Sequence, residues 1–182
     1  MLPPLSSARD QPDLWADWIN AAFADQPHRA AHLRRAYAEA CRLPMTALTL
    51  EERRTVRLAA LVHDVGRAVD PTDGLPHAIS GVLLIEVAGL PIVAAAVAHH
   101  SGALLDLAER GLPEGLLSPW PRDERLASVL TYLDAISGAM GQVVTVEARL
   151  ADIVARYGEA SRQVRAFRAT LAEIERGRAL SA

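Results

Sequence analysis

The chain of 182 residues contains no lysine, so all 19 of its basic side chains are arginine. Arginine binds phosphate and carboxylate through a planar fork of donors, which the ammonium group of lysine lacks. Acidic side chains are slightly more numerous, at 22, and the net charge is −3. Because no overall positive field attracts nucleic acid, we expect no duplex partner and a local arginine cluster for any anionic ligand.

Cysteine and long apolar runs are also scarce. The single cysteine, Cys41, excludes a disulfide within the chain, which fits a reducing cytoplasm. Residues 1–7 lack the basic start and the apolar run of a signal peptide. The most apolar stretch, residues 81–98, is interrupted by Glu86, Gly89 and Pro91, which makes it too broken to span a bilayer. We therefore expect a cytoplasmic protein with no membrane partner.

Aromatic residues make up only 4% of the chain, whereas 51% of its residues are apolar. The core must consist mainly of Ala, Leu and Val, and the first two favour helix strongly. Proline, glycine and a capping box at residues 49–52 mark helix boundaries. No alternating strand pattern stands between these boundaries, and we expect residues 143–146 to be loop. The sequence predicts an all-α domain over residues 1–182, with helices over 13–23, 27–42, 50–66, 76–87, 91–99, 104–110, 122–137, 146–157 and 161–178.

Histidines gather in one half of the chain. All six lie between positions 28 and 100, namely His28, His32, His63, His77, His99 and His100. His63 and Asp64 end an apolar stretch, and two polar residues there are costly to bury unless they are bonded or bind metal. Imidazole nitrogens with the carboxylates of Asp64 and Asp134 suit Fe, Mn, Zn, Ni or Co. The sequence therefore predicts a metal site around His63 and Asp64.

The order of these residues resembles the HD-domain superfamily of metal-dependent phosphohydrolases. The matching strings are HLRRA at His32, AALVHDVGR around His63, HAISG at His77, VAHHSG at His100 and LTYLDAISG around Asp134. The resemblance implies a bundle of five or more helices around a metal centre. Its metal-binding core would cover about residues 27–138, followed by a C-terminal helical extension over about 142–180. The overall resemblance is closest to small uncharacterised bacterial HD-domain proteins, which suggest a fold and a site but no substrate.

The resemblance also implies a ligand set for two divalent ions. One ion would be held by His32, His63, Asp64 and Asp134. The second would be held by His77 and His100, with Asp64 as the bridge between the ions. His99 remains an alternative ligand, because some relatives use both adjacent histidines.

The function implied is hydrolysis of a nucleotide or another small phosphate ester by a water molecule that the metal activates. Asp64 would fix the metal and orient the water. Arg67 and Arg35 are the candidates to hold phosphoryl oxygens in bidentate fashion. No Gly-Tyr-Pro motif follows His100, which argues against the cyclic-dinucleotide phosphodiesterase branch.

Two other functions stay open at the level of the sequence. A di-iron oxygenase can be built on the same scaffold, because His77 and His100 supply the additional ligands. A non-catalytic module that senses nucleotides is the other alternative. We expect the segments 67–75 and 102–121 to shape the pocket mouth. The C-terminal helices are expected either to cover the site or to form a homodimer interface.

Overall fold

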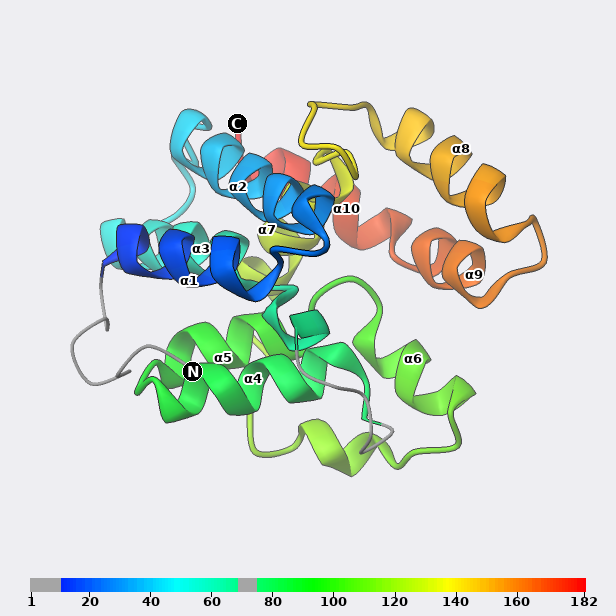
Figure 1. The fold of residues 1–182 in the computed structure, drawn as a ribbon, viewed down its shortest axis with the longest axis horizontal. Helices are drawn as coiled ribbons and strands as arrows, with labels where there is room; N and C mark the ends of the chain where they lie inside the picture. The colour runs from blue at the N-terminus through cyan, green and yellow to red at the C-terminus, as the bar shows by residue number, and fades with distance from the viewer. Residues whose placement is uncertain (1–10, 69–74) are drawn as a thin grey trace.

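Helices account for most of the chain described by the structure, a computed structural model that covers residues 11–68 and 75–182 (Figure 1). Within these residues there is no strand, and Ser137 and Val143 form one isolated bridge. The α-helices are α1 (Pro12–Ala22), α2 (Pro27–Arg42), α3 (Leu50–Val62), α4 (His77–Val87), α5 (Pro91–Ala98), α6 (Ala103–Glu109), α7 (Glu124–Ala135), α8 (Val146–Tyr157), α9 (Arg162–Ala169) and α10 (Leu171–Leu180). Two short 3₁₀ helices, η1 (Val65–Ala68) and η3 (Glu114–Leu117), lie between them. The predicted all-α fold is confirmed.

Local signals explain where several helices begin. Pro27 and Pro91 occupy the first helical position of α2 and α5, where a missing N–H costs nothing. The predicted capping box precedes α3, since the Thr49 hydroxyl accepts from the Glu52 N–H and the Glu52 carboxylate accepts from the Thr49 N–H. The first helix differs slightly, because it begins at Pro12 after an N-cap at Gln11 that makes no side-chain bond.

Two predicted helices end differently in the structure. The helix predicted over 50–66 stops at Val62, since the chain turns at His63 and Asp64 and continues as η1. The helix predicted over 161–178 is broken at Thr170 into α9 and α10. The Thr170 hydroxyl donates to the carbonyl oxygen of Phe167, and this side-chain bond competes with continuation of the helix. Most of the predicted 67–75 segment lies outside the described residues.

Helix α7 lies at the centre of the bundle and packs against α2, α3, α5 and α10. Its inner face is fully buried at Val129, Leu130 and Leu133. The approach of α10 is especially close, because a Cβ at Gly177 would lie 2.0 Å from the carbonyl oxygen of Ser128. The last helix of the chain is therefore packed into the core around the helix that carries Asp134.

Helices α8 and α9 have a different role from α10. Figure 1 shows them at one side of the molecule, away from α1. Each buries a single residue, Ile153 in α8 and Val164 in α9, so neither contributes much to the core. Their inner faces line a cavity, as described below.

The length and hydropathy of the helices also bear on membrane insertion. Within the described residues, no single helix is long and apolar enough to cross a bilayer. Helices α5 and α6 together reach that length only across a bend of 60°.

Candidate metal centre

His63 and Asp64 follow α3 directly, at the turn into η1. The apolar face of α3 carries the pair into the interior, where the side chain of His63 is fully buried. His63 Nδ1 lies 2.9 Å from the carbonyl oxygen of Ala60. Because a carbonyl oxygen only accepts, Nδ1 holds the proton and Nε2 is left with a free lone pair.

The same arrangement recurs at two other histidines. His100 Nδ1 lies 2.5 Å from the carbonyl oxygen of Val97, and His32 Nδ1 lies 3.4 Å from that of Gly138. Each ring is thereby oriented by the backbone and keeps Nε2 as its ligand atom. Histidines that bind metals are held by such bonds at the other ring nitrogen.

The ligand atoms of the described residues converge in two groups. In each group they lie within 4.8 Å of one another, and the groups are His32, His63 and Asp134, and His63, Asp64 and His100. His32 Nε2 is 3.1 Å from Asp134 Oδ1 and 3.2 Å from His63 Nε2. Two imidazole lone pairs repel each other at that distance unless a proton or a metal ion lies between them. Nitrogen and carboxylate donors placed in this way fit a divalent first-row metal.

The pKa shifts of His63 and His100 also fit a metal site. Burial lowers the pKa of His63, but the neighbouring carboxylate of Asp134 outweighs it and raises that pKa, so the centre attracts positive charge. Burial and the charges of His63 and His77 lower the pKa of His100 to about 4. His100 is therefore neutral at pH 7, as a metal ligand must be.

Asp64 is held by two side chains on one wall of the site. Arg67 Nε donates to Asp64 Oδ2 at 2.7 Å, and His77 Nε2 lies 3.1 Å from Asp64 Oδ1. Burial alone would raise the pKa of Asp64, but Arg67 and His77 keep it well below its usual range. The carboxylate is therefore ionised and suited to binding metal.

Asp134 is held on the opposite wall. Ser101 Oγ donates to Asp134 Oδ2 at 2.5 Å, and the Ser101 N–H donates to Thr131 Oγ1 at 3.1 Å. Burial would raise the pKa of Asp134, but the neighbouring imidazoles of His32 and His63 keep it well below its usual range. Ser101 therefore orients a carboxylate whose other oxygen faces the histidines.

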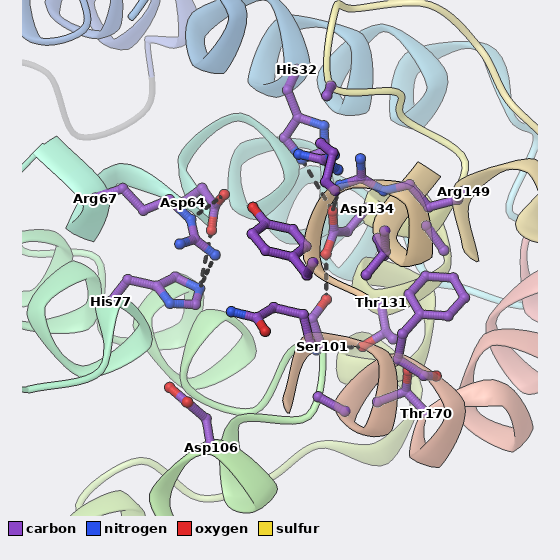
Figure 2. A pocket seen from close by; sticks show the side chains of 18 of the residues that line it. His32, Asp64, Arg67, His77, Ser101, Asp106, Thr131, Asp134, Arg149 and Thr170 are labelled. Atoms are coloured by element: carbon purple, nitrogen blue, oxygen red, sulfur yellow. Dashed lines mark hydrogen bonds and ion pairs between the residues drawn. The ribbon is translucent and has the colours of Figure 1, made fainter. Parts of the chain in front are cut away.

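A cavity of about 320 Å³ opens in front of these residues. Figure 2 shows Asp64, Arg67 and His77 on one side of it and His32, Asp134 and Arg149 on the other. The basic side chains on its walls are Arg29, Arg67, Arg110, Arg149, Arg156 and Arg162. Among the described residues, the acidic ones are Asp64, Asp106 and Asp134. The described walls of the cavity therefore carry an excess of positive charge even before any metal binds, which favours an anionic ligand.

The comparison with known families agrees with this geometry. The model of the HD domain family matches residues 28–153, which is more than half of the chain. The chain belongs to the HD domain family. No curated protein and no solved structure matches it. Membership places this HD-domain protein in a superfamily of metal-dependent phosphohydrolases and implies divalent metal binding, for which its His and Asp groups are the candidates.

The structure brings five of the six predicted HD ligands into the two groups described above. The sixth, His77, lies beside them, where its Nε2 is 3.1 Å from Asp64 Oδ1 and 3.2 Å from Arg67 Nη2. The alternative ligand His99 points elsewhere, because its Nε2 donates to the carbonyl oxygen of Trp120 at 2.6 Å. The geometry thus favours His100 over His99 as the ligand.

The two arginines expected to hold phosphoryl oxygens are placed differently. Arg67 lines the cavity beside Asp64. Arg35 does not line it, since its Nε donates to the carbonyl oxygen of Gly141 at 2.7 Å and its Nη1 lies 3.4 Å from Glu39. The expectation for Arg35 is corrected here, because the side chain ties α2 to the loop after α7.

Arg149 is a site residue that sequence reasoning missed. Its Nη2 lies 3.8 Å from Asp134 Oδ1, and its Nη1 is buried without a hydrogen-bond partner. The sequence does contain a signal, because Arg149, Ile153 and Arg156 share one face of α8 by helical spacing. Nothing in that spacing shows that this face meets the histidines.

Proposed function

We propose that this HD-domain protein hydrolyses the phosphate ester of a nucleotide or another small molecule through a metal-activated water. The observation that carries the proposal is that His32, Asp64 and Asp134, which belong to the two ligand groups, line a cavity whose described walls hold more arginines than carboxylates. Two carboxylates and several imidazoles suit a metal, and the arginines suit a phosphoryl group.

The residues assigned to the metal ions follow the family resemblance, and all of them except His77 belong to the two groups. His32, His63, Asp64 and Asp134 would hold one ion of Fe, Mn, Ni, Co or Zn. His77 and His100 would hold a second, with Asp64 shared between them. When bound, such ions lower the pKa of a coordinated water and neutralise phosphoryl oxygens.

Two arginines flank the carboxylates and are suited to orient the phosphoryl group. Arg67 bonds Asp64 through Nε. Arg149 lies between two carboxylates, with its Nη2 3.8 Å from Asp134 Oδ1 and its Nη1 3.6 Å from Asp152 Oδ2, but the buried Nη1 makes no hydrogen bond. Since a buried donor without a hydrogen bond is costly, a phosphoryl oxygen at Arg149 would relieve that cost and fix the orientation of the ester.

The test is hydrolysis of a panel of phosphate esters by protein loaded with Mn²⁺, Fe²⁺, Co²⁺, Ni²⁺ or Zn²⁺. We expect turnover of at least one ester, lost by roughly 100-fold or more in Asp64→Asn and His63→Ala together with bound metal. Arg34→Gln is the control, because Arg34 is exposed, bonds Asn20 and does not line the cavity. Oxygen uptake by an iron-loaded protein that turns over no ester would refute the proposal and favour the oxygenase.

A further inference from the structure

Arg29 differs from the other arginines of the cavity wall. It is half-buried in the first turn of α2, and its Nε donates to Gln26 Oε1 at 2.6 Å. Within the described part of the chain it forms no ion pair with a carboxylate. The first turn of α2 has no acidic residue, and the helix dipole is positive there, so the helix does not compensate the charge either.

Arg29 is also surrounded by further positive charge. Burial and the charge of Arg67 lower its pKa, Asp64 and Tyr157 oppose them in part, and Arg156 lowers the pKa further, so that the net pKa is lowered. Arg156 lies in the last turn of α8, with its guanidinium 5.2 Å from the centroid of the Tyr157 ring. Its carboxylate partner, Asp152, is 44% exposed, and exposed pairs contribute little.

We propose that Arg29 and Arg156 form a second anion subsite, which binds a second phosphoryl group of the substrate. The proposal rests on the proposed function, because the first phosphoryl group is the one held at the metal centre. The substrate class is therefore a diphosphate or bisphosphate, in preference to a monoester whose remaining part is neutral.

Charge on the opposite wall explains why the subsite is assigned to this pair. Arg110 and Arg162 both lie beside Asp106, at 3.2 Å and 3.1 Å, and share its negative charge. No carboxylate of residues 11–68 or 75–182 forms such a pair with Arg29. A phosphoryl group between α2 and α8 would accept bidentate bonds from two guanidinium groups that otherwise repel each other. Arg67 links the subsite to the metal centre, since it is close enough to act on Arg29 and it bonds Asp64.

The test uses calorimetry on the metal-free full-length protein, with inorganic pyrophosphate and orthophosphate at equal ionic strength. Wild-type protein is expected to bind pyrophosphate about tenfold more tightly than orthophosphate. Arg29→Gln and Arg156→Gln are each expected to raise the pyrophosphate Kd about tenfold or more, as for loss of a charged hydrogen bond. Arg34→Gln, on the same helix as Arg29, should stay within about twofold of wild type.

A second measurement guards against a folding defect. Since Arg29 is repelled by its neighbours, Arg29→Gln is expected to unfold at or above the wild-type temperature in phosphate-free buffer. Pyrophosphate should then raise the Tm of wild-type protein much more than that of the variant. A lowered Tm of Arg29→Gln without anion would refute the uncompensated charge that underlies the proposal.

Three results would overturn the subsite. The first is that Arg29→Gln and Arg156→Gln both bind pyrophosphate as tightly as wild-type protein does. The second is that wild-type protein binds pyrophosphate and orthophosphate equally tightly. The third is that Arg162→Gln loses more pyrophosphate affinity than Arg29→Gln does. None of these measurements requires turnover. A failure of the proposed hydrolysis is therefore distinguishable from a failure of the subsite.

Discussion

Gly66 joins the two halves of the metal centre, and its replacement by alanine tests how the site is held together. It lies in η1, two residues after Asp64, and packs against the start of α4, which carries His77. A Cβ at this position would lie 1.9 Å from the carbonyl oxygen of His77 and 2.5 Å from the backbone nitrogen of Gly81. Both atoms belong to the backbone, so no side chain can rotate away.

The size of the effect follows from this clash. Real Cβ atoms essentially never approach another heavy atom within 3.0 Å, so η1 and α4 must separate by about 1 Å or more. Overpacking of this kind costs about 3 kcal/mol, the upper end of the usual range. In a protein of this size the Tm should fall by about 6–12 °C. Because the separation also moves His77 from Asp64, metal affinity should fall as well.

The assay combines urea unfolding of the metal-free protein with titration of Mn²⁺ or Zn²⁺. Gly115→Ala is the matched control, because a Cβ there meets no atom within 4 Å. We expect the control to change the free energy of unfolding by less than about 0.5 kcal/mol and to leave metal affinity unchanged. A Gly66→Ala variant as stable as the control would refute the reasoning about this contact.

Three further predictions address the carboxylate, a helix cap and the pH dependence. Ser101→Ala removes the hydrogen bond to Asp134 and should lower metal affinity about 10- to 100-fold in a titration, so an unchanged affinity would contradict the orienting role. Thr49→Ala should lower the free energy of unfolding in urea by about 1 kcal/mol and leave metal affinity unchanged. A changed metal affinity would contradict the purely local role of this cap. The pKa of His100 falls from 6.5 to about 4 on folding, so the unfolded chain binds more protons than the folded protein between these pH values. The free energy of unfolding of the metal-free protein should therefore fall by roughly 3 kcal/mol, from this histidine, as the pH is lowered from 6.5 to 4. His100→Gln should lack this part of the loss, and an equal slope in both proteins would rule out the assignment.

Most of the helix pattern was predictable, since it depends on bonds between neighbouring residues. The capping box of Thr49 and Glu52 spans three residues, and Pro27 and Pro91 act at their own positions. The exceptions have local causes as well. At Thr170 a side-chain bond to Phe167 ends the helix, and propensity alone does not foretell whether a threonine hydroxyl will make such a bond.

The ligand groups were predictable for another reason. The strings around His32, His63, His100 and Asp134 resemble a known family, and the family places them at one point.

The walls of the cavity depend on contacts between distant parts of the chain. Arg35 bonds Gly141 across 106 positions and so leaves the cavity, while Arg149 reaches Asp134 because α8 returns to the bundle. A helical repeat shows that Arg149 and Arg156 share a face, but it cannot show what that face meets. The candidate metal ligands could thus be named from local and family patterns. The arginines around them could be assigned only once packing had placed α8 and α9 over the site.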